Sequence, residues 1–212
     1  MAKIPPKPIP HKPEKVIKLV IVDFYGVMML GSYKDTCQWI AKKYNLDYEH
    51  VYDVVYHKYF SQAALGEITE EESFAGAVKE LSLKETWQEL RDKHLSYQIL
   101  NQDVFNLARE LQDKGITILL LSKNTPGQLN FALNKYHIRQ YFKNIINTFD
   151  LKLPKASPET IAYVLKKFNV KPEETIMTDD QDFNLTEPAR AGVHTVLYTD
   201  SPTLESKIRK LI

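Results

Sequence analysis

Asp23 is the first residue whose type and position suggest chemistry. It ends the apolar run KLVIVD, residues 18–23, and Gly26 follows three residues later. A continuous apolar run of this length is typical of a strand buried on both faces of a parallel sheet. Functional groups in such sheets collect at the carboxyl ends of the strands. The sequence therefore places Asp23 where a reactive carboxylate is expected.

Polar residues also follow the other apolar runs. ITILLLS ends at Ser122, with Asn124 close behind; Lys155 follows NIINTF; ETIMTDD ends in Asp179 and Asp180. Taken singly, such a serine is usually a helix cap, such a lysine is usually solvated, and such an acidic pair usually belongs to a turn. Their recurrence at successive strand ends predicts one shared site.

Strands and helices alternate along most of the chain. After residues 18–23, the predicted strands are 116–122, 144–149, 174–180 and 194–200. Apolar stripes at helical spacing lie between them, one ended by Gly115 and one opened by Ser157 as cap with Pro158 at the first position. The members of these two stripes are Val104, Leu107, Ala108 and Leu111, and Ile161, Val164, Leu165 and Phe168. The pattern predicts an α/β fold with a parallel sheet.

Residues 32–98 break this alternation. Apolar residues recur there at helical spacing, as in Cys37, Ile40 and Tyr44, and Thr69 with Glu72 forms a capping-box pattern. The sequence therefore predicts a helical insert at 32–98 within a core made of 16–31 and 99–212. The insert includes an aromatic run, Tyr52 to Phe60, which we interpret as helix packing in preference to a face over the substrate.

The composition excludes several classes of protein. The chain has 212 residues, of which 43% are hydrophobic and 26% charged, and its net charge is +1. Bulk charge gives no sign of nucleic-acid binding, no apolar run is long enough to span a membrane, and the first residues lack a signal-peptide pattern. A single cysteine, Cys37, predicts a reducing, cytoplasmic setting. The sequence carries no signal of oligomeric state.

The first fifteen residues differ in composition from the rest. They contain five Pro, four Lys and one Glu, which gives them a charge of about +3 and leaves about −2 for the remainder. Such a segment cannot bury a core, and we expect a disordered, solvated tail in preference to a docking tail for a partner.

The order of these motifs resembles the haloacid dehalogenase superfamily. Its four motifs correspond to VDFYGV, to ILLLS, to KASP at 155–158, and to MTDDQDFN, in which Asp180 and Asn184 stand four residues apart. The helical insert matches the α-helical cap that the family carries between its first and second motifs. The resemblance implies a three-layer, Rossmann-like core and covers residues 16–200.

The resemblance also implies roles for individual residues. Asp23 would be the nucleophile that forms an aspartyl intermediate on a small phosphorylated substrate. Mg²⁺ would be held by Asp23, the backbone carbonyl of Tyr25 and Asp180, with Asp179 in support. The substrate's phosphoryl oxygens would be bound by Ser122, Asn124 and Lys155.

Tyr25 departs from the family pattern. The family's phosphatases have a second aspartate here, which protonates the leaving group and then deprotonates the attacking water. A phenol with a pKa near 10 is a poor general base at neutral pH. Three interpretations are open: a phosphohydrolase for good leaving groups such as acyl phosphates, a catalytically weak binding protein of the same fold, or a 2-haloacid dehalogenase, whose family members carry Tyr here.

Two observations count against the dehalogenase. Those enzymes pair the substrate carboxylate with an arginine soon after the first motif, and this chain has no arginine before Arg91. The adjacent acids Asp179 and Asp180 would also repel an anionic substrate unless a metal ion lay between them. We therefore favour the Mg²⁺-dependent phosphohydrolase.

Overall fold

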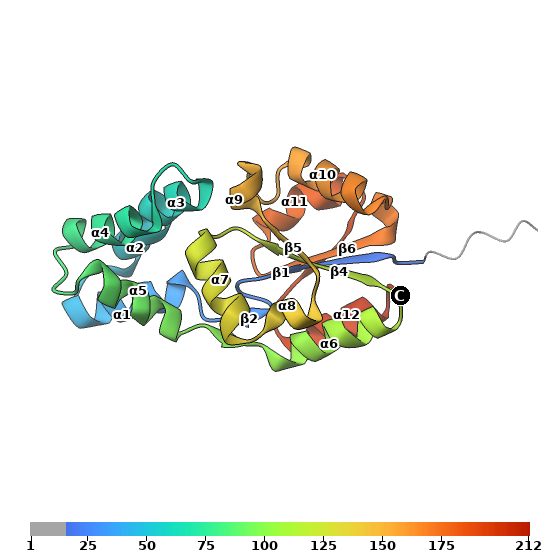
Figure 1. The fold of residues 1–212 in the computed structure, drawn as a ribbon, viewed down its shortest axis with the longest axis horizontal. Coiled ribbons are helices and arrows are strands. Elements are labelled where there is room, and N and C mark those ends of the chain that lie inside the picture. The colour runs from blue at the N-terminus through green and yellow to red at the C-terminus, as the bar shows by residue number, and fades with distance from the viewer. Residues whose placement is uncertain (1–15) are drawn as a thin grey trace, which may run out of the picture.

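A five-stranded parallel sheet forms the centre of the protein, as a computed structural model of residues 16–212 shows (Figure 1). The strand order is β5-β4-β1-β6-β7, so β1 lies in the middle of the sheet. The predicted α/β class is confirmed. The tail predicted at residues 1–15 lies outside the described residues. The strands are β1 Leu19–Asp23, β4 Thr117–Ser122, β5 Asn144–Asn147, β6 Thr175–Asp179 and β7 His194–Leu197.

β5 and β7 end two or more residues before their predicted limits, because residues within or just after the predicted strands cap helices. Asn147 accepts a hydrogen bond from the Phe149 amide and opens the short helix α9, Thr148–Leu151. Beyond β7, Asp200 accepts one from the Thr203 amide and caps α12, Ser201–Arg209. Capping side chains of this kind compete with strand extension at each position.

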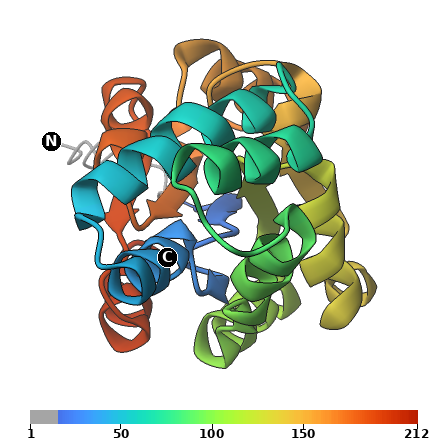
Figure 2. The same cartoon turned by 90° about the vertical axis from the view of Figure 1, so that its left-hand side faces the viewer.

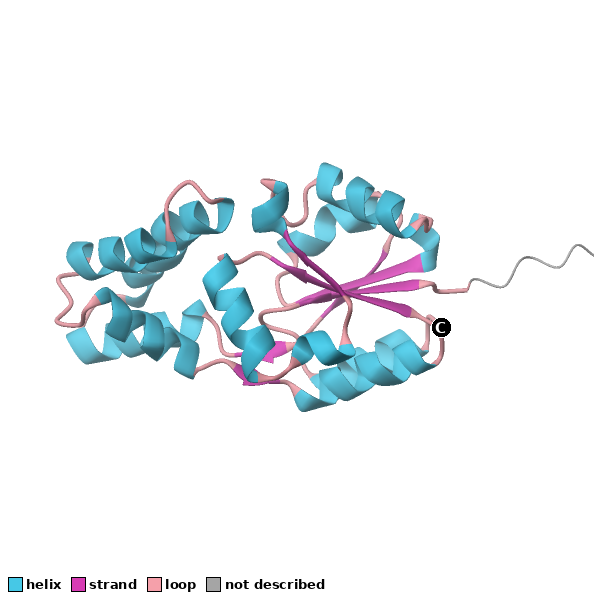
Figure 3. Ribbon diagram, in the orientation of Figure 1, coloured by secondary structure: helices cyan, strands magenta, loops and turns pink. Residues whose placement is uncertain are grey.

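Helices cover both faces of the sheet and give it three layers (Figure 3). Alternate residues of β1 point to opposite faces, as strand geometry requires. Besides α9 and α12, the helices of the core are α6 Gln102–Asp113, α7 Pro126–Lys135, α8 Ile138–Tyr141, α10 Pro158–Phe168 and α11 Phe183–Arg190, with a short 3₁₀ turn at Pro172–Glu174. Val20 and Val22 pack with α6 and α12, whereas Leu19 and Ile21 pack with α10 and α11.

The remaining helices form a separate group, here called the cap helices, beyond the carboxyl ends of the strands (Figures 1 and 2). They pack around their own apolar cluster, which includes Cys37, Ile40, Phe74 and Leu90. Thr69 and Glu72 form the predicted capping box. The cap helices are α1 Tyr33–Tyr44, α2 Tyr48–Tyr52, the π-helix Asp53–Phe60, α3 Ser61–Leu65, α4 Glu70–Glu80 and α5 Trp87–Ser96.

A two-stranded ribbon joins the cap helices to the core. β2, Met29–Leu30, pairs antiparallel with β3, Ile99–Leu100. Two-residue strands are too short to show an alternating pattern, so the sequence does not predict them. Within residues 16–212, no helix is long and apolar enough to cross a membrane.

Candidate active site

A buried lysine bridges two carboxylates at the carboxyl edge of the sheet. Asp23 ends β1, Asp179 ends β6, and Lys155 reaches them from the loop between α9 and α10. The Lys155 ammonium contacts Asp23 Oδ1 and donates to Asp179 Oδ2 at 2.6 Å. All three side chains are at most 5% exposed. Ion pairs at such depth hold a fixed geometry, because breaking one leaves an uncompensated charge.

Both carboxylate oxygens of Asp179 are engaged by protein groups. Its Oδ2 accepts from Lys155, and its Oδ1 accepts from the Gln181 amide at 2.9 Å and from Asn184 Nδ2 at 3.0 Å. The residue therefore fixes Lys155 beside Asp23 and orients the loop that follows β6.

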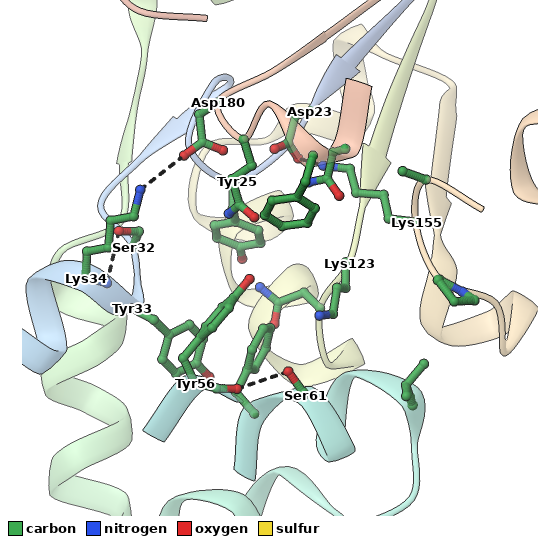
Figure 4. A pocket seen from close by; sticks show the side chains of 18 of the residues that line it. Asp23, Tyr25, Ser32, Tyr33, Lys34, Tyr56, Ser61, Lys123, Lys155 and Asp180 are labelled. Atoms are coloured by element: carbon green, nitrogen blue, oxygen red, sulfur yellow. Dashed lines mark hydrogen bonds and ion pairs between the residues drawn. The ribbon is translucent and has the colours of Figure 1, made fainter. Parts of the chain in front are cut away.

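Asp180 is placed differently from its neighbour. Its Oδ1 is buried and has no hydrogen-bond partner among the described residues, and its Oδ2 lies 3.9 Å from Lys34 Nζ (Figure 4). Carboxylate oxygens of Asp23, Asp179 and Asp180 lie within 4.8 Å of one another. An unpaired buried carboxylate oxygen is costly, and a hard divalent cation with oxygen ligands would satisfy it. The residues present thus fit Mg²⁺.

Burial and mutual repulsion raise the pKa values of the carboxyl groups in this cluster. Burial raises the pKa of Asp23, the neighbouring Lys155 ammonium opposes that rise, and Asp179 adds to it. Burial and Asp179 likewise raise the pKa of Asp180. Burial alone would lower the pKa of Lys155, but Asp23 and Asp179 raise it instead. Three carboxylates facing one buried ammonium leave a surplus of negative charge that a dication would offset.

The Tyr25 hydroxyl points away from the strand-end acids (Figure 4). It donates to the backbone carbonyl of Gln128 on α7 at 2.9 Å, with Gln98 Oε1 at 3.5 Å. Burial raises the pKa of this phenol far above its usual value. The side chain is therefore a neutral hydrogen-bond donor whose proton is already engaged.

Ser122 and Asn124 follow β4 in different surroundings. Ser122 is fully buried, and its hydroxyl has no partner among the described residues. Asn124 lines the cavity described next; its backbone amide donates to Asn147 Oδ1 at 3.1 Å and its carbonyl accepts from Asn147 Nδ2 at 2.8 Å. β4 pairs directly with β1, so both residues lie beside Asp23.

A cavity of about 400 Å³ lies between the strand ends and the cap helices. The core contributes Asp23, Lys155 and Asp180 to its walls, together with Lys123, whose pKa is lowered by burial and then by Lys155. The cap helices contribute Lys34 and four aromatic residues, Tyr33, Tyr52, Tyr56 and Phe60. The predicted site residues thus lie at one edge of the sheet, and Asp23, Asn124, Lys155 and Asp180 among them face the aromatic rings across the cavity. Ser122 and Asp179 are fully buried and do not line it.

Sequence reasoning missed several of these residues. Lys34 lies in the first turn of α1 and Lys123 directly follows β4. Nothing in the spacing of these two lysines distinguishes them from solvated lysines. The scattered histidines have no metal-ligand spacing, which predicts surface or half-buried positions, and for His94 this prediction is wrong. His94 is buried, lines the cavity and stacks on the Tyr33 ring at 4.1 Å.

The protein has an α/β fold with a cluster of acids and a buried lysine at the carboxyl edge of its parallel sheet. The sequence model of the haloacid dehalogenase-like hydrolases matches residues 17–192, and the chain belongs to this family. The resemblance inferred from the motifs is thereby confirmed.

Individual relatives are more distant. The pyrophosphatase PpaX of Oceanobacillus iheyensis is 27% identical over 92 residues, which amount to 43% of this chain and 43% of that protein. A haloacid dehalogenase family enzyme from Bacteroides thetaiotaomicron, solved with magnesium and inorganic phosphate, has a TM-score of 0.70 at 19% identity, covering 86% of this chain and 94% of its own. A dehalogenase structure has a TM-score of 0.64 at 18% identity, covering 85% and 84%. These structural likenesses concern the fold alone.

Proposed function

We propose that the protein is a Mg²⁺-dependent phosphohydrolase that acts through an aspartyl intermediate on small phosphorylated substrates with good leaving groups. The observation that carries this proposal is the unpartnered, buried Asp180 Oδ1 close to the Asp23–Lys155 pair. The similarity to a pyrophosphatase and the magnesium and phosphate bound by a structural neighbour support it.

Asp23 is the nucleophile in this proposal. Its carboxylate attacks phosphorus, the bond from phosphorus to the leaving oxygen breaks, and water later hydrolyses the aspartyl phosphate. Lys155 and Asn124, which line the cavity, bind the phosphoryl oxygens. Ser122 is a further donor in this proposal, because its buried hydroxyl at the end of β4 has no partner among the described residues.

Asp23, the backbone carbonyl of Tyr25 and Asp180 would hold Mg²⁺, with Asp179 in support through Lys155 and Asn184. Such an ion supplies charge that offsets the repulsion between the nucleophile and an anionic phosphoryl group. Gly26 allows this arrangement, because a Cβ there would come within 2.5 Å of Asp180 Cγ.

Tyr25 restricts the reaction to leaving groups that depart without a proton. Its hydroxyl is bonded to a backbone carbonyl and faces away from Asp23 and Asp180. General acid help is worth roughly 10²–10⁴-fold in rate. Acyl phosphates and activated aryl phosphates need little of that help, whereas sugar phosphates need most of it.

The dehalogenase alternative meets an obstacle in the cavity. No arginine of residues 16–212 lines it, and Arg91 is paired with Glu70. A catalytically weak binding protein would bind the metal and phosphate without turnover. Measurement of the hydrolysis rate therefore distinguishes this alternative from the proposed enzyme.

Calorimetric titration with Mg²⁺ tests the metal site. Wild type should bind at millimolar concentration or tighter, and Asp180→Asn should bind at least tenfold more weakly. Asp182→Asn, which removes an exposed acid two residues away, should bind as wild type does. Equal binding by all three proteins would overturn the proposed site.

Turnover tests the proposed reaction in the same preparation. Acetyl phosphate should be hydrolysed and sugar phosphates should be nearly inert. Metal binding without turnover of acetyl phosphate would instead favour the binding protein.

A further inference from the structure

A row of stacked aromatic rings forms the cap side of the cavity. The rings of Tyr52 and Tyr56 stack at 4.9 Å and 17°, those of Tyr56 and Phe60 at 5.3 Å and 27°, and Phe60 lies 4.2 Å from Tyr33. Tyr56 and Phe60 belong to the π-helix. Side chains four residues apart in this helix lie on the same face. π-Helical turns occur often at functional sites.

Packing accounts for only part of this row. Phe60 is 3% exposed and belongs to the apolar cluster of the cap helices. Tyr52 and Tyr56 are half-buried, and both line the cavity. Tyr48 extends the same row, 5.8 Å from Tyr52, but does not line the cavity. The cavity therefore meets aromatic surface that the cap helices leave uncovered.

Lys123 places a positive charge beside these rings. Its Nζ lies 5.6 Å from the Tyr56 ring centroid and 5.8 Å from that of Phe60. Among the described residues it has no carboxylate partner, whereas Lys155 is paired with two. Figure 4 shows Lys123 between the rings and the loop of Lys155. An ammonium so placed is available to an oxyanion of the substrate.

We propose that the leaving group of the substrate is an aromatic ring, so that the substrate class is an aryl phosphate. The proposal rests on the phosphohydrolase function above. The ring packs against the edge of Tyr56 that faces the cavity, because Tyr52 and Phe60 already stack on the Tyr56 ring. The Lys123 ammonium pairs with the phenolate oxygen. That oxygen takes the electron pair of the broken phosphorus–oxygen bond and acquires its proton from water. Such a leaving group fits a site that has no carboxylic acid at position 25.

Two esters with leaving alcohols of similar acidity test the aromatic site. Phenyl phosphate should have a kcat/KM several-fold above that of hexafluoroisopropyl phosphate. Tyr56→Leu should lower the value for phenyl phosphate roughly three- to tenfold, which is the usual contribution of an aromatic pair, and leave the fluoroalkyl ester nearly unchanged. Tyr48→Leu, in the same row but outside the cavity, should change neither. Equal kcat/KM for the two esters, or an equal loss for both in Tyr56→Leu, would overturn the aryl site while leaving the phosphohydrolase intact.

Binding of inert analogues separates the two proposals. Phenylphosphonate should bind wild type more tightly than methylphosphonate does in calorimetry with Mg²⁺, and Tyr56→Leu should remove the difference. If neither ester is hydrolysed but this preference holds, the phosphohydrolase fails and the aromatic site stands. If the two phosphonates bind equally, the aromatic site is wrong.

Discussion

Tyr25 provides a structural hydrogen bond at a position where an acidic side chain could take part in catalysis. A carboxylic acid there would be able to protonate a leaving group, whereas the phenol directs its proton to a backbone carbonyl, away from Asp23 and Asp180. The phenol instead reaches α7, where it donates to the Gln128 carbonyl at 2.9 Å. The ring also meets Phe24 edge-on, with centroids 5.0 Å apart. The side chain therefore holds the turn after β1 against α7.

Replacing Tyr25 by Asp should restore hydrolysis of alkyl phosphates. General acid–base help sets the upper limit of the gain at roughly 10²–10⁴-fold, and loss of the bond to Gln128 reduces it. Steady-state kinetics on an alkyl phosphate measure the effect. Tyr25→Phe, which removes the hydroxyl without adding an acid, should leave the low alkyl rate unchanged. Adding Asp23→Asn to Tyr25→Asp should abolish activity; an alkyl rate unaffected by Tyr25→Asp would show that the missing acid is not limiting.

The charged residues of the site were predictable because they stand at the ends of strands that the sequence reveals. Asp23, Asp179 and Asp180 stand directly after apolar runs, and parallel strands bring their carboxyl ends to one edge. The aromatic row was not predictable as a cavity wall. Helical spacing shows that Tyr52, Tyr56 and Phe60 share a face, but it cannot say whether that face meets other helices or a cavity.

The turn after β1 brings the first and fourth motifs together. The Gly26 amide donates to the Met29 carbonyl at 2.8 Å, and the Met28 amide donates to the Asp23 carbonyl at 3.1 Å. Gly26 has a φ of +97°, a conformation that residues with a side chain rarely adopt. A Cβ there would lie within 2.8 Å of all three carboxylate atoms of Asp180. The turn therefore requires glycine at position 26, because the Asp180 carboxylate occupies the space that a side chain would need.

Gly26→Ala should damage the metal site beyond its effect on stability. Backbone strain at positive φ costs about 1–2 kcal/mol, and the added methyl group also displaces Asp180. Gly115→Ala is the matched control, because its φ is +86° and nothing lies within 4 Å of its Cβ. Urea unfolding should show a similar loss of stability for both variants. Only Gly26→Ala should weaken Mg²⁺ binding in calorimetry, and equal Mg²⁺ affinity in the two variants would contradict this account.

The sequence predicts the strands of the sheet but not the π-helix or the two-stranded ribbon. All five strands of the sheet were recognised, because parallel strands are long apolar runs. The π-helix was not, since its hydrogen-bond register leaves no mark on side-chain spacing that distinguishes it from an α-helix. The ribbon of β2 and β3 was missed because only two residue pairs form it.

A buried polar network ties the cap helices to the core. Gln128 of α7 donates through Nε2 to the Tyr33 hydroxyl at 2.7 Å, and its Oε1 lies 3.1 Å from His94 Nε2. His94 Nδ1 lies 2.9 Å from the Thr36 hydroxyl. With Nε2 donating to Gln128 and Nδ1 accepting from Thr36, a neutral imidazole satisfies every partner. The contact between the cap helices and α7 thus fits an uncharged His94.

Protonation of His94 should therefore couple stability to pH. Burial lowers its pKa from the usual 6.5 to about 4, although the bond to Gln128 opposes that shift. Below pH 6.5 the unfolded chain binds a proton that the folded chain refuses until about pH 4. Stability is consequently retained at neutral pH and lost as pH falls through this window, by about 2 kcal/mol between pH 7 and 5.

Urea unfolding of wild type and His94→Gln at pH 7 and 5 measures this coupling. Carboxylates titrate alike in both proteins, so the difference between their pH dependences isolates the imidazole. The free energy of unfolding of His94→Gln should fall about 2 kcal/mol less than that of wild type over this range, whatever its stability at pH 7. His50→Gln, at an exposed position of α2, should keep the wild-type dependence. An unchanged pH dependence in His94→Gln would show that acid does not act on the cap helices through this network.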